Sequence, residues 1–398
     1  MDCTMTTTEH PGPHSTGHND YGYAETGGPH AAPSSPLNPP IAPLEDEDGE
    51  EPEDFVTDTE SLRSRSDYDE DFMETYSLSS SILDYQYENG RRYASFRSGH
   101  YMMPNDEEEQ ERLDLTHHIY LMLMGGELYN APIKNPQKVL DLGTGTGNWA
   151  IDFADSHPGA MVVGNDLSPI QPSWVPPNVD FFVDDYEADW LEKLNAYDFI
   201  HSRNLAGYDP YPRPPLHLPH PYSHPSAHTI NPARCVMDWH RLIRQAYDHL
   251  KPGGYLELQE SAVWAWSDDG TLTMDSPLME YLMALNDAGH MIGRELNIYI
   301  DLKPWLLAHG FEDVHEQTYI LPFSPWPQDP RLREIGRVQA AMVEKAVEAY
   351  GLRLCTQVLG WSQDRTRIMQ SLVRQQLKDR SQHSYTKIKV VYGRKPLI

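Results

Sequence analysis

The stretch VLDLGTGTGNW at residues 139–149 constrains the fold of this chain more than any other feature. A short apolar run ends at Asp141 and Leu142, glycine then alternates with threonine, and a helix is expected to begin after Gly147. Glycine has no Cβ and tolerates positive φ angles, so a glycine-rich turn between a strand and a helix lets the backbone approach a ligand closely. We therefore expect a ligand site at this turn.

Three classes of ligand compete for such a turn. A P-loop is excluded because no Gly-Lys-Ser/Thr sequence follows the glycines. A dinucleotide site requires GxGxxG, whereas this turn reads GxGxG and has Asn148 where the third glycine of that fingerprint would stand. Asp141 is a poor neighbour for a pyrophosphate and a good one for the ammonium group of S-adenosylmethionine, whose carboxylate the helix N-terminus favours. The turn therefore favours S-adenosylmethionine.

Acidic residues also end the next two apolar runs. Asp166 lies 19 residues beyond Gly147 and is placed to accept hydrogen bonds from ribose hydroxyls, although dinucleotide enzymes share that spacing. Asp184 and Asp185 follow the run at 179–183, where a carboxylate can accept from an adenine amino group. The predicted cofactor-binding residues are Asp141, Gly143, Thr144, Gly145, Gly147, Asp166, Leu167, Asp184, Asp185 and Arg203.

Strand and helix patterns alternate along the chain. Strands are expected at 139–142, 161–165, 179–183, 197–201, 255–259, 314–320 and 387–392. Helices are expected from about 105 to 124, with Asn105 and Glu108 as a capping-box-like pair, and at about 236–250, 331–349 and 363–378. This alternation predicts an α/β fold with a parallel sheet and helices on both faces.

The domain boundaries follow from composition. The first 70 residues hold 17 acidic residues and only two bases, Arg63 and Arg65, and they are rich in Pro, Ser, Thr and Gly. We therefore predict a disordered acidic tail at 1–68. Residues 69–138 are predicted to form a helical N-terminal lid or extension. Residues 139–398 are predicted to form the main domain, interrupted by a Pro/His-rich insertion at 207–232.

These motifs resemble those of a known family. VLDLGTGTG, GNDLSP (164–169), VDDYEADW (183–190), YDFIHSRNLAG (197–207) and LKPGGYLELQE (250–260) resemble successive motifs of a class I methyltransferase. NGRRY (89–93), MPNDEEEQERLDL (103–115) and YGRKP (392–396) are similar to fungal methyltransferases related to the velvet-complex regulator LaeA. The resemblance spans about residue 70 to the C-terminus. It implies a Rossmann-like, seven-stranded, mostly parallel sheet, S-adenosylmethionine binding, and for some members a role in regulating secondary metabolism. The insertion at 207–232 departs from the family pattern.

Candidates for the chemistry lie near the carboxyl ends of the strands, where the crevice of a doubly wound sheet opens. His201 is a candidate general base because the histidine pKa lies near neutrality, the alternative being a packed histidine. Arg203 either pairs with a ligand carboxylate or with one of the protein's acids. Tyr93, in the segment before the sheet, is a candidate for a cation–π contact with the sulfonium, the alternative being ordinary packing.

Composition argues against several classes of partner. With 31 Lys and Arg against 60 Asp and Glu, the net charge of −29 disfavours a nucleic-acid substrate. The three cysteines form neither a disulfide framework nor a thiol pair for zinc, and we assign no metal to the histidines at 217, 220, 224 and 228, which lie among prolines. We see no signal peptide and no membrane span, and predict an intracellular protein of the cytoplasm or nucleus.

The sequence therefore predicts an S-adenosylmethionine-dependent methyltransferase that acts on a small-molecule or protein acceptor. The alternative is a regulator with a methyltransferase fold that acts by binding a protein partner. A nicotinamide oxidoreductase is disfavoured by Asn148 and Asp141.

Overall fold

The computed structural model describes residues 85–94, 103–205, 238–294 and 296–398, which all belong to one compact unit, Thr75–Ile398. The predicted disordered tail at 1–68 and the insertion at 207–232 lie outside the described residues. The boundaries of these two segments therefore stay predictions.

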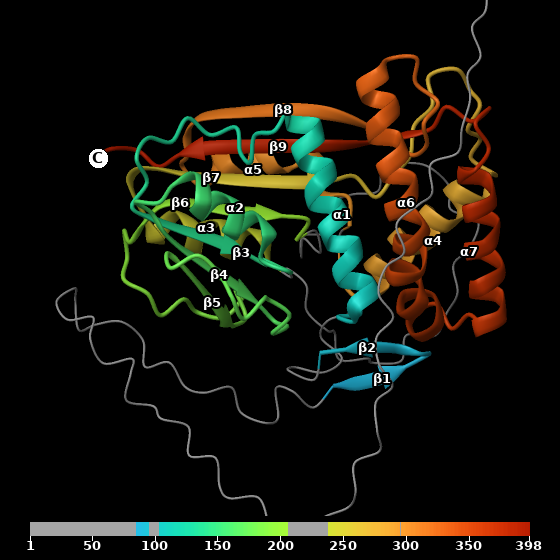
Figure 1. Cartoon of the computed structure of the whole chain (residues 1–398), viewed down its shortest axis with the longest axis horizontal. Coiled ribbons are helices and arrows are strands. Elements are labelled where there is room, and N and C mark those ends of the chain that lie inside the picture. Colours follow the sequence, from blue (N-terminus) through green and yellow to red (C-terminus); the bar gives the residue numbers. More distant parts are fainter. Residues whose placement is uncertain (1–84, 95–102, 206–237, 295) are drawn as a thin grey trace, which may run out of the picture. The chain divides into compact units, whose positions relative to one another are not determined.

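The described unit contains a seven-stranded sheet with the order β5-β4-β3-β6-β7-β9-β8, which lies beside a group of longer helices in Figure 1. Its strands are β3 (Lys138–Leu142), β4 (Met161–Asp166), β5 (Val179–Val183), β6 (Tyr197–Arg203), β7 (Leu250–Ser261), β8 (Glu312–Pro322) and β9 (Tyr385–Arg394). The first five are parallel, and β9 runs antiparallel to both of its neighbours. Every predicted strand is present, and the predicted fold class is confirmed.

The strand order places a switch point between β3 and β6. From β3 the chain adds β4 and β5 on one side, and β6 then begins on the other side of β3. Ligands bind outside the carboxyl ends of the strands at such a point, because the connections on its two sides leave in opposite directions. The glycine turn follows β3 and therefore lies at the switch point.

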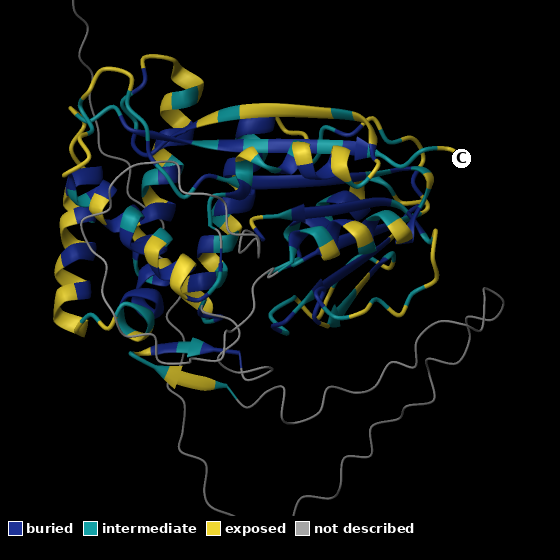
Figure 2. Ribbon diagram, turned by 180° about the vertical axis from the view of Figure 1, so that it is seen from behind, coloured by how far each residue is buried: buried dark blue, intermediate teal, exposed yellow. Residues whose placement is uncertain are grey.

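Helices cover both faces of the sheet, as the alternating pattern predicts. On one face α2 (Asn148–Ser156) packs Trp149 and Phe153 against Val139 and Phe199. On the other face α3 (Trp239–His249) and α5 (Leu302–Ala308) share a core with Ile200 of β6. The central strands are buried, whereas the edge strand β8 is largely exposed (Figure 2).

A layer of longer helices packs with the ends of β8 and β9. It consists of α1 (Glu107–Met124), α4 (Pro277–Met291), α6 (Pro330–Arg353) and α7 (Gln363–Leu377). A 3-10 turn (Ile298–Ile300) precedes α5, and a π turn (Leu354–Val358) follows α6. Helix α4 was not predicted, although Ser276 caps its first turn and Pro277 begins it, both of which are start signals.

A hairpin of β1 (Gln86–Glu88) and β2 (Arg91–Tyr93) precedes α1 and was not predicted either. Its turn residues Asn89 and Gly90 have φ angles of 54° and 83°, and Asn-Gly is a strong hairpin signal. The hairpin is tied to the start of α1, because the Arg91 guanidinium donates to both oxygens of Asp106 at 2.6 and 2.7 Å.

The N-cap of α1 differs from the prediction by one residue. The Asp106 carboxylate, rather than the Asn105 amide, accepts the backbone N–H of Glu109, at 3.1 Å. Asn105 instead lies beside β2, where its own N–H donates to the carbonyl of Arg92 at 2.8 Å. The negative charge of an aspartate at the cap also interacts favourably with the helix dipole. It forms an ion pair with Arg91, which an asparagine cannot do.

Candidate active site

The glycine turn connects β3 to α2 with three residues at positive φ. Gly143, Gly145 and Gly147 have φ angles of 64°, 59° and 82°. A Cβ on Gly143 would lie 2.3 Å from Cδ2 of Leu205, and one on Gly147 would lie 2.4 Å from Cζ of Phe181. A side chain at either position would therefore be strained by the positive φ angle and would displace Leu205 or Phe181.

Asp141 ends β3 and is held from two sides. Its Oδ1 lies 2.7 Å from Nδ1 of His201 on the neighbouring strand, and its Oδ2 accepts the Thr144 hydroxyl at 2.7 Å. The imidazole of His201 is fully buried and stacks on Trp149 of α2, with ring centroids 3.7 Å apart. Burial lowers the pKa of His201, although the hydrogen bond with Asp141 opposes this. The arrangement fixes the orientation of the Asp141 carboxylate.

Asp166 ends β4 and faces the glycine turn. Its carboxylate accepts the backbone N–H of Gly145 and that of Ser168, each at 2.9 Å. Burial raises the pKa of Asp166 to about 6. Because each carboxylate oxygen can accept more than one hydrogen bond, Asp166 keeps acceptor capacity for a ligand hydroxyl.

A cavity of about 330 Å³ opens at this edge of the sheet, within the size range of small-molecule sites. The residues that line its polar end include Asp141, Gly143, Thr144, Gly145, Asp166, Leu167, Tyr186, His201, Arg203 and Asn204. The cavity continues into an apolar region between α4, α6 and the ends of β8 and β9.

Helix α1 is tied to the glycine turn at the polar end of this cavity. The Asp114 carboxylate accepts the Thr146 hydroxyl at 2.9 Å and the Asn148 amide at 2.7 Å. Because Asn148 begins α2, this one carboxylate links α1 to both the turn and the helix that follows it.

Two further contacts hold α1 over the carboxyl ends of the strands. Nε2 of His117 lies 2.8 Å from the Asp152 carboxylate of α2. The Tyr120 hydroxyl donates to Asn204 after β6 at 2.8 Å. Both His117 and Tyr120 line the cavity, so side chains of α1 form one of its walls.

The predicted cofactor residues divide between this cavity and other places. Gly147 is the N-cap of α2 and does not line the cavity. Asp184 is exposed and Asp185 is buried, accepting the Glu187 N–H at 2.9 Å. Neither aspartate lines the cavity, although the adjacent Tyr186 does.

Arg203 lines the cavity, and its predicted ligand-binding role stays a prediction. Its guanidinium lies 3.1 Å from Nδ1 of His117 and 5.0 Å from the ring centroid of Tyr120. The arginine is therefore held against α1, beside the polar end of the cavity.

Tyr93 does not line the cavity. It is buried in β2, where the Arg353 guanidinium lies 3.4 Å from its ring centroid. Burial raises the pKa of its hydroxyl to about 12. This ring therefore makes a cation–π contact with an arginine of the protein and does not face the cavity in which the sulfonium was expected.

Several cavity residues were not predicted from the sequence. Tyr120 and His117 were part of a predicted helix, but nothing in their spacing shows which side of it faces the glycine turn. Asn204, which the sequence places at the crevice after the fourth strand, follows β6 with a φ angle of 55° and lines the cavity, but it was given no role. Gln339 of α6 gave no signal, because it meets the site only through the tertiary fold.

The described residues contain no cluster of three or more His, Cys, Asp and Glu side chains arranged to hold a metal. The histidines at 217, 220, 224 and 228 fall outside that part of the chain. Among the helices of the described ranges, none combines the length and apolar character that a bilayer crossing requires.

A mostly parallel seven-stranded sheet, its antiparallel β9 and a glycine turn at the switch point define a class I methyltransferase fold. The chain belongs to the methyltransferase family whose domain model matches residues 115–316, and within that family it is a LaeA-like fungal methyltransferase.

Three relatives illustrate this membership. Methyltransferase pytC of Aspergillus terreus is 40% identical over 322 residues, covering 80% of this chain and 91% of its own length. The secondary metabolism regulator LAE1 of Cochliobolus heterostrophus is 34% identical, covering 78% of this chain and 94% of its own. The protein-methionine methyltransferase laeA of Emericella nidulans is 31% identical, covering 81% of this chain and 79% of its own.

Proposed function

We propose that this methyltransferase uses S-adenosylmethionine, bound at the polar end of the cavity. The observation that carries the proposal is Asp166, a buried carboxylate that lines the cavity beside a turn of three positive-φ glycines. The ribose hydroxyls would donate to Asp166, and the ammonium group would lie near Asp141. When bound, S-adenosylmethionine supplies a methyl group that an acceptor lone pair can take, while the carbon–sulfur electron pair stays on sulfur.

The protein residues bind and orient the cofactor, and they exclude water from it. Helix α1 shields the polar end of the cavity, which strengthens the electrostatic contacts of a charged ligand there. We propose that His201 acts as a positioning residue rather than as the base, because its Nδ1 is engaged with Asp141 and its ring is fully buried against Trp149. A nitrogen acceptor that is already neutral requires no strong base.

The biological setting rests on the relatives. Proteins named for methyl transfer and for the regulation of secondary metabolism are both 31–40% identical to this chain. Methyl transfer in secondary metabolism or its regulation is therefore the function we propose. A regulator that acts only by binding a partner is the weaker candidate, because Asp141, Asp166 and the glycine turn are all present around a cavity.

Titration calorimetry of the full chain with S-adenosylhomocysteine tests the proposal. Asp166→Ala should weaken binding by about 1–3 kcal/mol, since ligand hydroxyls lose a buried partner. The matched control is Asp184→Ala, which removes a nearby exposed carboxylate outside the cavity and should leave the affinity unchanged. Equal affinities for the wild type and Asp166→Ala would contradict the assigned role of Asp166. Binding of NAD in place of S-adenosylhomocysteine would contradict the cofactor itself.

A further inference from the structure

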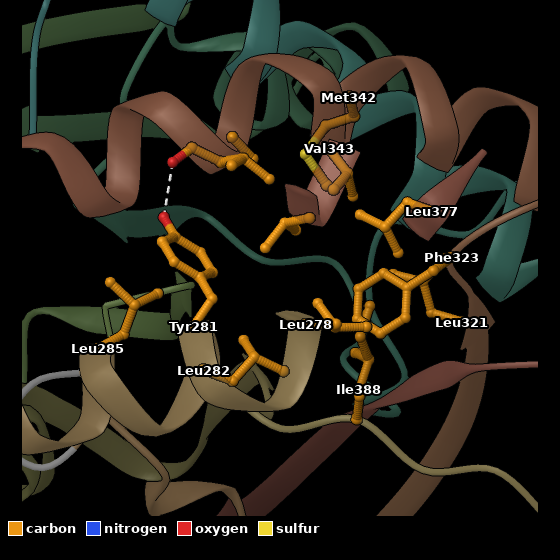
Figure 3. Close-up of a cluster of buried hydrophobic side chains, with 14 of the residues drawn as sticks. Leu278, Tyr281, Leu282, Leu285, Leu321, Phe323, Met342, Val343, Leu377 and Ile388 are labelled. Carbon is orange, nitrogen blue, oxygen red and sulfur yellow. Dashed lines mark hydrogen bonds between the residues drawn. The ribbon is translucent and has the colours of Figure 1, made fainter. Parts of the chain in front are cut away.

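The cavity extends well beyond the residues that a cofactor at the glycine turn would need. Its far part, which we name the apolar compartment, lies between α4, α6 and the ends of β8 and β9. In Figure 3 the labelled side chains of α4 and α6 point toward one another. The lining residues of the apolar compartment include Leu278, Tyr281, Leu282, Leu285, Leu321, Phe323, Gln339, Met342, Val343, Ala346, Val347 and Ile388.

Among these lining residues there is no charged side chain. The charged residues that line the cavity lie on α1, on β3, β4, β6 and β7, and after α4; examples are Arg112, Asp141, Asp166, Arg203, Glu260 and Arg294. The Tyr281 hydroxyl, a polar group of the apolar compartment, donates to the carbonyl of Val347 at 2.6 Å. A ligand body in this compartment would therefore contact mainly hydrocarbon, and a charged group there would lose its hydration without a partner.

Gln339 is the exception to this apolar lining. Its relative exposure is only 2%, and its Oε1 accepts no hydrogen bond within the described part of the chain. Two buried glutamines of α7, by contrast, each have a hydrogen-bond partner in the protein. Gln370 donates to the carbonyl of Val347 at 3.2 Å, and Gln376 accepts the N–H of Leu278 at 2.7 Å. Gln339 is one of the residues that line the cavity, and a buried amide oxygen without a protein partner in that wall points to a donor supplied by a ligand.

We infer that the methyl acceptor is an uncharged, mainly apolar small molecule that carries an O–H or N–H group. Its hydrocarbon body occupies the apolar compartment, and its donor binds Oε1 of Gln339. The inference rests on the proposed function, because it takes the cofactor to fill the polar end of the same cavity. A protein acceptor fits less well, since the compartment is assigned to the hydrocarbon body of a small molecule.

Competition binding on the full chain, saturated with S-adenosylhomocysteine, tests this inference. The neutral fluorescent probe phenylnaphthylamine reports occupancy, and naphthol and methylnaphthalene of the same substitution pattern compete with it. These competitors share a shape and differ in one hydroxyl. Gln339→Met should lower the ratio of naphthol to methylnaphthalene affinity about fivefold or more, because it removes the acceptor and keeps the volume. Because the cost of dehydrating the naphthol hydroxyl is the same for both proteins, it cancels when the affinity ratios of the wild type and the variant are compared.

Two further variants make the result specific. Gln370→Met changes a glutamine that is equally buried but does not line the cavity, and it should keep the wild-type ratio. Ala346→Leu narrows the apolar compartment and should weaken both competitors alike, which tests the location even if Gln339→Met does not fold. All variants should bind S-adenosylhomocysteine with the wild-type affinity, as measured by calorimetry.

The inference is overturned if wild type and Gln339→Met show the same ratio, or if the probe does not bind the wild type. It is also overturned if a methionine-containing peptide displaces the probe and naphthol does not, which would indicate a protein acceptor. Failure of the wild type to bind S-adenosylhomocysteine would overturn the proposed function, and with it the assignment of this compartment to an acceptor. Binding of S-adenosylhomocysteine without any naphthol binding would overturn the inference alone.

Discussion

Gly145 shows how a single residue joins backbone conformation to ligand binding. Its φ angle is 59°, its N–H donates to Asp166 at 2.9 Å, and it lines the cavity. A Cβ on Gly145 would lie 3.4 Å from Leu113 of α1. The residue therefore faces both α1 and the cavity. An added methyl group would therefore occupy the side of the turn that faces a ligand.

Gly145→Ala should abolish or severely weaken S-adenosylhomocysteine binding while the protein stays folded. The matched control is Gly270→Ala, at a φ angle of 75° with open space around it and outside the cavity. Both variants place alanine in the left-handed region, at a cost of about 1–2 kcal/mol each. The melting temperature should fall by a similar amount in both variants. Calorimetry should show lost S-adenosylhomocysteine binding only for Gly145→Ala. Similar affinities for both variants would count against a ligand at the turn.

Several site residues were predictable because they follow from local pattern. Asp141 and Asp166 end apolar strands, and the carboxyl ends of parallel strands meet at one edge of the sheet. The location of Tyr93 was not predictable, because its neighbour Arg353 is distant in the sequence and on a different element. Gln339 likewise reaches the cavity only through the packing of α6.

At the scale of elements, β7 anchors the connection between α1 and β3. Glu257 of β7 is fully buried, and its Oε2 accepts the N–H groups of Asn130 and Ala131 at 2.8 and 2.7 Å. Its Oε1 accepts the Gln259 amide at 2.8 Å. Burial raises the pKa of Glu257 from 4.5 to about 7, with these hydrogen bonds opposing the shift.

This raised pKa predicts a pH-dependent stability. Between pH 4.5 and 7 the folded protein binds the proton of the Glu257 carboxyl more tightly than the unfolded chain does. The contribution of this group to the free energy of unfolding is therefore lost as pH rises through that window. Glu257→Gln resembles the protonated form and should gain stability relative to the wild type between pH 5 and pH 8, on the order of 3 kcal/mol. Urea unfolding at both pH values measures the difference. A difference that does not vary with pH would show that Glu257 titrates normally.

The elements themselves differed in how well the sequence predicted them. All seven strands of the large sheet were predicted, and the five parallel ones were recognisable because buried parallel strands leave short apolar runs bounded by turn residues. The hairpin β1–β2 and helix α4 were missed, although Asn89-Gly90 and Ser276-Pro277 carried usable signals. The shifted cap of α1 reflects a choice between two adjacent good capping residues, which Arg91 decides.

At the scale of the whole molecule, the cavity depends on segments far apart in the sequence. Helix α1 precedes the sheet, α4 and α6 follow β7 and β8, and all three line the same cavity. Local pattern could predict the glycine turn at its polar end. The apolar compartment could not be predicted, because it arises from the way α4 and α6 pack over the ends of β8 and β9.

The central claim is that a cofactor binds at the glycine turn, against α1. Amide hydrogen exchange of the full chain with and without S-adenosylhomocysteine tests it most directly, because ligand contact slows the opening of the backbone it stabilises. We predict slower exchange at residues 141–147 and 112–120, no change in the edge strand β8, and less slowing in Asp166→Ala at a ligand concentration that only just saturates the wild type. Unchanged exchange at both 141–147 and 112–120, despite saturating ligand, would contradict cofactor binding at this turn.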